Sequence, residues 1–440
     1  MNTAARTIGI LYNAVLKPLM SAAFFVGGLL NKKFALRAAG VQQSRITLQN
    51  LPPKRGKRLW FHAASMGEFE QAKPVIEYIR RTRPDIEILA SFFSVSGYEN
   101  QKNYDGADWK VYIPIDTRRE ARRFVERVQP DAAVFVRYDI WFNHLNELRG
   151  RNIPAYLICA TVNQQSWLYR APFIPFTRAA YDCFTTVFAL DQNEADLFNS
   201  LHLGQNVVVS GDTRMDRIVA AVEQSRHTPA LPADALDSNR IYLALGSSWP
   251  VEEQLLAQAV GLLDRNVRQT LGLIIVPHEP TPDHIRTVRE QYPQARLYSE
   301  LNNGETAVHT HDISYPRLTA SGDAVPVIII DTVGLLLRVY AQAALAFVGG
   351  GFGAGVHSVT EPAGHALPIC CGPDIDRARA AQELQAAGGL EVIESAASLA
   401  QWLSEMLLNS EKRARQGEVA EMYVKERTGF SEEIGERVVA

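Results

Sequence analysis

Short apolar runs alternate with segments of helical periodicity over most of the chain. Residues 117–128, for example, place Ala121, Phe124, Val125 and Val128 on one face of a helix. Strands separated by helices predict an α/β fold with a parallel sheet and right-handed crossovers. The predicted strands of this first series are residues 59–65, 86–93, 110–115, 132–136, 153–160, 185–190 and 206–211.

The periodicity is lost at residues 226–239, which are rich in proline and predict a linker. A second alternating series follows it. A chain of 440 residues is too long for one ordinary core, so two doubly wound domains are expected, with the ligand at the carboxyl ends of their strands. The predicted strands of the second series are residues 241–248, 271–277, 325–331, 345–350 and 367–372.

The N-terminal segment differs from the rest of the chain. Residues 8–30 are apolar except for Lys17, which Pro18 follows, and ten Lys or Arg residues precede Glu68, the first carboxylate. A central charge disfavours a spanning helix or a signal peptide and favours a helix lying at the membrane interface, although all three remain open. The basic residues predict an anionic membrane surface as partner. Nothing in the composition indicates binding to nucleic acid.

Three polar loops follow predicted strands of the second series. They are residues 246–248, residues 277–279 and the glycine run 349–355. Glycines at a strand-to-helix turn let the backbone approach a phosphate, but they also permit a tight turn against a neighbouring strand. The run matches neither the dinucleotide motif nor the P-loop motif, which argues against an oxidoreductase or an NTPase. Glu361, shortly after the run, is either a ribose ligand or a solvated helix residue.

In the first series, Ser65 and Glu68 follow a strand and open a helix. The spacing predicts a capping box, in which the two side chains bond each other's backbone N–H groups. It also allows Glu68 to act as a general base at the carboxyl end of the strand. Asp139, at another strand end, is an N-cap or a site residue. The four cysteines lie in apolar runs without metal-binding spacing and are expected to be buried thiols.

Six blocks of the sequence carry a resemblance to a known family: FHAASMGEFEQAKPVIEYIR (61–80), SGDTRMDR (210–217), GSSWPVEE (246–253), VPHEP (276–280), DTVGLLLRVY (331–340) and FVGGGFGAGVHSVTEPAGHALPICCGP (347–373). Taken together, these motifs resemble those of the lipid A Kdo (3-deoxy-D-manno-octulosonic acid) transferases, and their residues are most similar to the Bacteroidetes-type branch. The resemblance implies a GT-B architecture with two Rossmann-like domains facing a central cleft. It implies a membrane-associated segment at 1–45, an acceptor domain at 46–225, a linker at 226–239 and a donor domain at 240–440, whose last helices can pack back on the first.

The resemblance also implies the reaction and its residues. An inverting enzyme would move Kdo from CMP-Kdo to a hydroxyl of a tetraacylated lipid A precursor, at the cytoplasmic face of the inner membrane, without a metal or other cofactor. Glu68 would be the base, with Ser65, Gly67 and Asp139 near the acceptor. The residues implied for donor binding are Arg214, Gly246, Ser247, Ser248, Pro277, His278, Gly350, Gly351, Phe352, Gly353, His357, Ser358 and Glu361.

Three positions depart from the family pattern. Ser358 stands where Asn is usual, Asp139 where many members have Glu, and Arg137 where Glu or Lys is frequent. Two other functions stay open: a GT-B enzyme of envelope synthesis that uses a UDP-sugar, and an inactive, membrane-bound lipid-binding protein. The number of Kdo residues added, the acyl preference and the oligomeric state are not indicated by the sequence.

Overall fold

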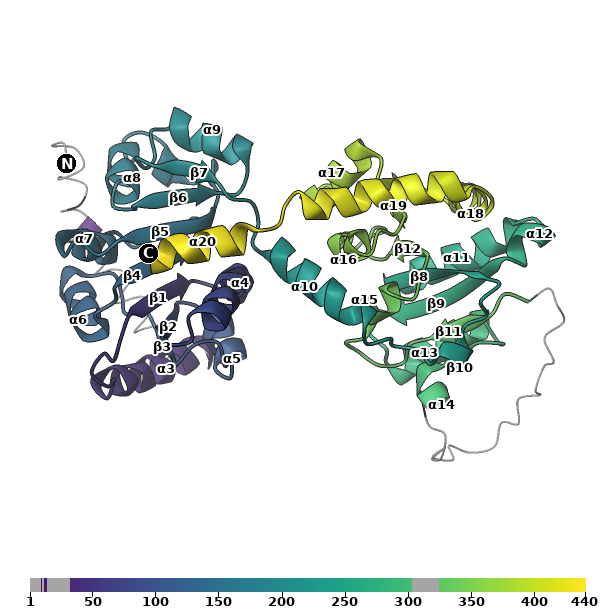
Figure 1. Ribbon diagram of the computed structural model, residues 1–440, viewed down its shortest axis with the longest axis horizontal. Coiled ribbons are helices and arrows are strands. Elements are labelled where there is room, and N and C mark those ends of the chain that lie inside the picture. Colours follow the sequence, from purple (N-terminus) through teal and green to yellow (C-terminus); the bar gives the residue numbers. More distant parts are fainter. Residues whose placement is uncertain (1–8, 10–11, 14–31, 303–323) are drawn as a thin grey trace. The chain divides into compact units, whose positions relative to one another are not determined.

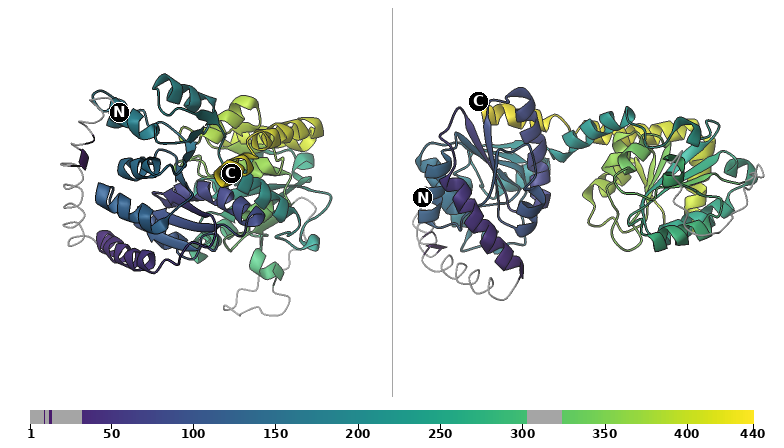
Figure 2. Two further views of the ribbon diagram at one scale, coloured as in Figure 1. Left: turned by 60° about the vertical axis from the view of Figure 1, so that its left-hand side comes forward. Right: turned by 90° about the horizontal axis from the view of Figure 1, so that it is seen from below.

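The computed structural model describes residue 9, residues 12–13, 32–302 and 324–440. These residues divide into two compact units, the first comprising residues 1–216 and 427–440 and the second residues 217–426. In each unit, helices cover both faces of a central sheet (Figure 1; Figure 2). The sequence prediction of two doubly wound α/β sheets is confirmed.

The sheet of the first unit has seven parallel strands in the order β3-β2-β1-β4-β5-β6-β7. Side chains alternate between its two buried faces: Leu59 and Phe61 pack on one face and Trp60 on the other. Because helices cover both faces of the sheet, the strand sequences are continuous runs of apolar residues. The strands are β1 Arg58–Ala63, β2 Glu87–Phe92, β3 Trp109–Tyr112, β4 Ala132–Val136, β5 Ala155–Ala160, β6 Thr186–Ala189 and β7 Val207–Val209.

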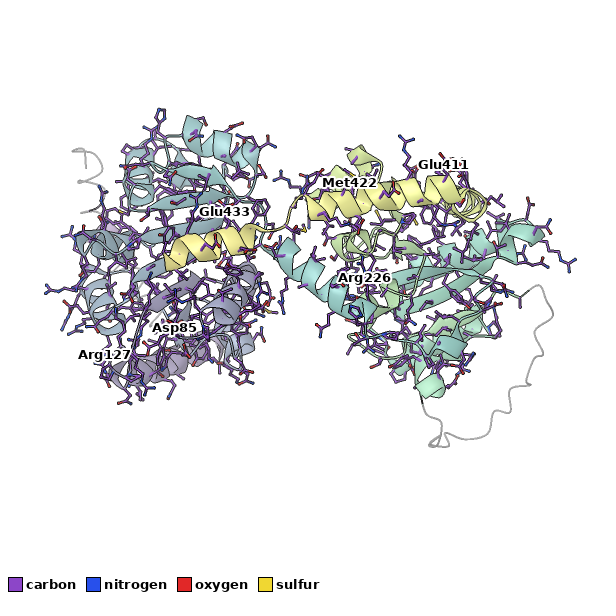
Figure 3. The ribbon with its side chains drawn as sticks, in the orientation of Figure 1. Asp85, Arg127, Arg226, Glu411, Met422 and Glu433 are labelled. Atoms are coloured by element: carbon purple, nitrogen blue, oxygen red, sulfur yellow. The ribbon has the colours of Figure 1, made fainter. Side chains whose placement is uncertain are left out.

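One helix of the first unit comes from the C-terminus. Helix α20 (Phe430–Val439) packs beside α4, where Gly435 lies so close to Tyr78 that an added Cβ would be 2.5 Å from its ring. Figure 3 labels Glu433 on this helix. The other helices are α3 Lys32–Gln49, α4 Met66–Thr82, α5 Val95–Gln101, α6 Arg118–Val128, α7 Phe142–Gly150, η2 Trp167–Tyr169, α8 Ile174–Tyr181 and α9 Gln192–Ser200.

The second unit contains another parallel seven-stranded sheet, in the order β10-β11-β9-β8-β12-β13-β14. The five strands predicted for it are present, and the two short edge strands β10 and β14 were not predicted. The strands are β8 Ile241–Ser248, β9 Leu271–Pro277, β10 Arg296–Leu297, β11 Val327–Ile329, β12 Leu345–Val348, β13 Ile369–Cys371 and β14 Leu390–Val392.

The chain passes from the first unit to the second within α10 (Arg214–Arg226). Residues 226–239, for which the sequence predicted a linker, lie in the second unit. There the Gln342 side chain accepts from the N–H groups of Ala230 and Leu231, each at 2.8 Å, and ties the segment down. The other helices are η3 Ala233–Ala235, α11 Pro250–Leu262, α12 Arg265–Arg268, α13 Pro282–Gln291, α14 Tyr298–Asn302, α15 Leu336–Tyr340, α16 Thr360–Gly364, α17 Arg379–Ala387, α18 Ala396–Leu408 and α19 Ser410–Lys425.

Most of the apolar segment 8–30 lies outside the described residues. Tyr12 is described, and its hydroxyl donates to Asp116 Oδ2 over 2.6 Å while its ring packs on Phe142 and Phe176. Asn13 Oδ1 accepts from Asn143 Nδ2 over 2.9 Å. This part of the segment is therefore docked on the first unit. Among the helices described, none has the length and apolarity needed to cross a bilayer.

Candidate functional site

The first cluster of predicted site residues follows β1. Ser65 is the N-cap of α4: its hydroxyl accepts from the Glu68 N–H over 3.4 Å, and Glu68 Oε2 accepts from the Ser65 N–H over 3.0 Å. The predicted capping box is confirmed. Gly67, one residue before Glu68, is exposed, and a Cβ added to it would meet nothing within 4 Å. Packing does not require a glycine there, and its absent side chain leaves the first turn of α4 open to a ligand.

Glu68 is a buried carboxyl group with 5% of its surface exposed. Burial, and secondly the charge of Asp139, raise its pKa above the ordinary value. Hydrogen bonds from the backbone of Ser65 and Ala64, and then His62, act in the opposite direction but do not cancel the rise. A carboxylate whose pKa is raised towards neutrality holds a proton better than an ordinary glutamate, so it is a stronger base.

Asp139 follows β4, the neighbour of β1, and its Oδ2 lies 3.2 Å from His62 Nε2. The other ring nitrogen, Nδ1, lies 2.8 Å from Ser91 Oγ, which accepts from Trp60 Nε1 over 2.7 Å. The Ser91 hydroxyl has two acceptors within reach, His62 Nδ1 and Phe61 O at 3.5 Å. His62 Nε2 and Asp139 Oδ2 lie close to each other but form no hydrogen bond in the described structure. His62 was not among the predicted site residues, although it begins the motif that ends in Glu68.

The charge of Asp139 has a testable consequence for Glu68. We expect Asp139→Asn to lower the pKa of Glu68, because a neutral amide no longer disfavours the glutamate anion. If Glu68 is the base, the acid limb of kcat/KM for the acceptor should move to lower pH, whereas Asp139→Glu, which keeps the charge, should leave it in place. The measurement is a pH-rate profile of the three proteins. If the acid limb of the Asp139→Asn profile stayed at the wild-type pH, the charge of Asp139 would not act on the catalytic base.

The second cluster of predicted residues lies in the second unit, after the adjacent strands β9, β8 and β12. The rings of Trp249 and His278 stack with centroids 4.9 Å apart, and those of His278 and His357 with centroids 4.5 Å apart. Trp249 Nε1 also donates to His357 Nε2 over 3.2 Å. Burial, and then the neighbouring His278, lower the pKa of His357, so it is a neutral ring near pH 7. The three loops therefore meet through this stack.

The glycines of the run are required for two different structural reasons. At Gly349 and Gly351 an added Cβ would lie 2.3 Å from Ser247 O and 2.6 Å from Gly372 N, so the fold needs glycine for close backbone approach. Gly355, at φ 87°, meets nothing within 4 Å. Glycine is required at position 355 because the backbone there is left-handed, and the missing side chain leaves this end of the run open.

Glu252 is a residue of this cluster that was not predicted. Its side chain is buried and accepts from the Trp249 N–H over 3.1 Å and from the Gly350 N–H over 2.9 Å. Burial raises its pKa, against hydrogen bonds from the backbone that include those of Gly350 and Phe352. The Gly350 N–H, expected to face a phosphate, thus holds the loop to α11. Ser358 is exposed, and its hydroxyl lies 3.1 Å from that of Thr360.

Glu361 lies in the first turn of α16, and burial raises its pKa. Its charge contributes, after burial, to a raised pKa of Tyr340. The Tyr340 hydroxyl has no hydrogen-bond partner within the described part of the chain. That hydroxyl packs under Gly246, where an added Cβ would come within 2.1 Å of it. Glu361 is therefore a desolvated carboxylate at the same end of the unit as the three loops.

Arg214 is the one predicted donor residue outside the second unit. It belongs to the first unit, where its Nη2 lies 2.5 Å from Asp212 Oδ2. Asp212 also accepts from Gln71 Nε2 over 3.3 Å, which links the pair to α4. The four cysteines are buried thiols, as expected. The structure thus assembles Ser65, Gly67, Glu68 and Asp139 in one unit and the loop residues with Glu361 in the other.

Two doubly wound units with polar clusters at the carboxyl ends of their strands define a protein of the GT-B type. Among solved structures, the fold is similar to the UDP-GlcNAc 2-epimerase of Neisseria meningitidis bound to UDP-GlcNAc (TM-score 0.56, 14% identity, 87% of this chain and 100% of that one). It is also similar to Acinetobacter baumannii MurG (TM-score 0.51, 12% identity, 87% and 99%). At these identities the likeness concerns the fold.

Sequence comparisons indicate which kind of GT-B protein this is. The family model described as 3-deoxy-D-manno-octulosonic-acid transferase (kdotransferase) matches residues 35–217. The transferase of Haemophilus influenzae is 24% identical over 380 residues (83% of this chain, 82% of the relative), and that of Bordetella pertussis 23% over 389 residues (84% of each). The chain thus contains the domain of these transferases at residues 35–217, and over most of its length it is similar to 3-deoxy-D-manno-octulosonic acid transferases. These findings support a Kdo transferase, which is a glycosyltransferase.

Proposed function

We propose that the protein transfers Kdo from CMP-Kdo to a hydroxyl group of a tetraacylated lipid A precursor, with inversion at the anomeric carbon. The similarity to Kdo transferases supports Kdo as the sugar, and the observation that carries the mechanism is Glu68. It is a buried carboxylate with a raised pKa, held at the start of α4 by its bond to the Ser65 N–H.

In the proposed reaction the acceptor hydroxyl oxygen attacks the anomeric carbon of Kdo while the bond to the CMP phosphate breaks. The hydroxyl proton passes to Glu68, and CMP leaves as a phosphate monoester. Because this leaving group is already a weak base, the reaction needs no strong general acid. Ser65, Gly67 and Asp139 would line the acceptor side. No metal or other cofactor takes part in this scheme.

On the donor side we assign the CMP moiety to the second unit. Glu361 would accept hydrogen bonds from the ribose hydroxyls, and the open end of the glycine run would face the phosphate. The stacked Trp249, His278 and His357 hold the three loops in a fixed geometry. Such preorganised groups stabilise charge that develops on a leaving phosphate without further reorganisation. Arg214 stays a proposed donor ligand from the first unit.

The direct test is incubation of the purified protein with CMP-Kdo and the tetraacylated precursor, read by mass spectrometry. A product heavier by one or more Kdo residues is expected, and its absence with an active control enzyme would overturn the proposal. A second GT-B reaction, with a UDP-sugar, is separated by thermal shift: CMP or CTP should stabilise the protein and UDP should not. An inactive lipid-binding protein would bind the precursor without converting it.

We further propose that the protein lies at the cytoplasmic face of the inner membrane, held by its N-terminal segment. Deleting residues 1–30 should release much of the protein from anionic liposomes, since it removes the apolar surface and part of the basic charge. Transfer to bilayer-embedded acceptor should fall more than transfer to detergent-dispersed acceptor. High salt should release the full chain only partly, because it screens the charges but not the apolar contact.

The described part of the segment supplies a control. Tyr12→Phe removes the hydrogen bond to Asp116 but keeps every apolar side chain of residues 8–30. It should therefore float with liposomes like the wild type in a flotation assay. If the truncated protein floated equally well, the anchor would be refuted, and the segment would serve to pack on the first unit, as Tyr12 does.

A further inference from the structure

The turn after β4 contains a strained cationic residue that the proposed mechanism does not use. Arg137 has a φ of +63°, in the left-handed region that side chains other than Gly, Asn and Asp rarely enter. Its backbone is held there, because its N–H donates to Ile158 O over 2.9 Å and its carbonyl accepts from the Thr161 N–H over 3.4 Å. Glycine or asparagine would adopt this backbone conformation at lower cost, so the backbone alone does not account for an arginine at this position.

The Arg137 side chain is partly buried. Its Nε is buried without a hydrogen-bond partner, and in residues 32–302 and 324–440 the side chain forms no ion pair. Two other arginines of this unit have anionic partners. Arg58 pairs with Glu87 over 2.8 Å and donates to two carbonyl groups, and Arg80 pairs with Asp108 over 2.5 Å. A buried N–H group without a partner is unfavourable, and an anionic ligand bound to the guanidinium would supply that partner.

The surroundings leave the binding edge of the guanidinium available. Its central carbon lies 5.8 Å from the centroid of the Tyr138 ring, and Tyr138 is 42% exposed. A cation–π contact engages the flat face of a guanidinium, whereas its N–H groups point outwards along the edge in the fork that fits a carboxylate or phosphate. The neighbouring Asp139 is directed towards His62 instead.

The position of Arg137 relates this site to the acceptor. It follows β4, which pairs with β1 in parallel register, and two residues after it comes Asp139, whose charge acts on Glu68. We propose that Arg137 binds an anionic group of the acceptor, a phosphate monoester or a carboxylate, and so selects acceptors that carry one beside the reacting hydroxyl. This inference rests on the proposed function, in which the first unit binds the acceptor.

The test compares the full-length wild type with Arg137→Gln, Arg137→Lys and Arg137→Asn on three acceptors: the phosphorylated lipid, the same lipid after phosphatase treatment, and the dephosphorylated lipid carrying one Kdo. Arg137→Gln should raise the acceptor KM about 10- to 100-fold where the anion is present, the usual loss for charge-assisted hydrogen bonds, with kcat changed only a few-fold. It should match the wild type on the lipid that lacks both anions. Arg137→Lys should fall between, because it keeps the charge but loses the fork.

The pattern identifies the ligand. If Arg137→Gln raises KM only for the phosphorylated lipid, the site binds phosphate. If it raises KM only for the lipid that carries Kdo, the site binds the carboxylate. Both results support the inference. An equal loss on all three acceptors, or no loss on any, would overturn it. Arg137→Asn should melt no lower than the wild type, because asparagine tolerates the left-handed backbone; a lower melting temperature with reduced kcat on every acceptor would show a structural role. If the wild type transfers no Kdo, the proposed function fails, and this inference fails with it.

Discussion

Glu68→Gln is expected to lower the turnover of Kdo transfer by about two to four orders of magnitude, the range typical of a lost general base. The amide cannot accept the proton of the attacking hydroxyl, although it has the size of the carboxylate and can still bond the Ser65 N–H. Binding of CMP, which we assign to the second unit, should not change. The measurement is kcat with saturating donor and acceptor, together with CMP affinity by calorimetry.

The folding of this variant can be predicted from the raised pKa of Glu68. A carboxyl group whose pKa is higher in the folded than in the unfolded protein stabilises the fold below its unfolded pKa, and this contribution is lost as pH rises through the folded pKa. At pH 7 the buried anion is therefore unfavourable, and Glu68→Gln should melt at the same temperature as the wild type or higher.

A matched control is Glu70→Gln, on the same helix. Glu70 is partly buried and forms an ion pair with Lys73 at 2.5 Å. Glu70→Gln removes this charge but keeps the size of the side chain, and it should leave kcat near the wild-type value. Turnover of Glu68→Gln within a few-fold of the wild type would reject Glu68 as the base. The capping box would then be its whole role.

Much of the fold could be predicted from the sequence because parallel strands buried on both faces are uninterrupted apolar runs. Residues 132–136 were predicted as a strand and form β4 with those bounds. The edge strand β10, by contrast, has two residues, one exposed and one partly buried, which leaves no pattern to detect. The helix α4 begins at Met66, since Ser65 caps it, although its apolar periodicity becomes evident only further along.

The candidate site was predictable where its chemistry is local in sequence. Ser65 and Glu68 are three residues apart, so their reciprocal bonds could be expected from spacing alone. The contact between His62 and Asp139 joins β1 to the turn after β4, and only the order of the sheet brings it about. Glu252 likewise reaches Gly350 from another loop, a contact that no motif spacing encodes.

The glycine run illustrates the same limit. A series of glycines indicates close approach or unusual backbone, but it does not say what approaches each position. Gly351 is required by the backbone of Gly372 on the neighbouring strand connection, whereas Gly355 is required by its own positive φ. Close approach to a neighbouring strand is therefore confirmed for Gly351, and approach of a phosphate to the run stays a prediction.

Glu361→Ala is expected to weaken CMP binding about 10- to 100-fold, the loss that corresponds to hydrogen bonds made by a charged group. Glu361 is desolvated by burial and near no cation that pairs with it in the described residues, so its anion is available to hydroxyl donors. Because burial raises its pKa, CMP affinity should also fall as the pH is lowered through that pKa. Calorimetry of CMP binding at several pH values measures both effects.

The ribose itself supplies the sharper comparison. If Glu361 bonds the 2′-hydroxyl, the wild type should bind 2′-deoxy-CMP more weakly than CMP, and Glu361→Ala should bind the two alike, since the partner of that hydroxyl is gone. Glu405→Gln, on α18 and ion-paired with Lys412, is a control carboxylate of the same unit that should keep the full preference. A preference for CMP that survives in Glu361→Ala, or an unchanged CMP affinity, would place the ribose elsewhere. The desolvated carboxylate would then act on Tyr340 and the packing under Gly246 rather than on the donor.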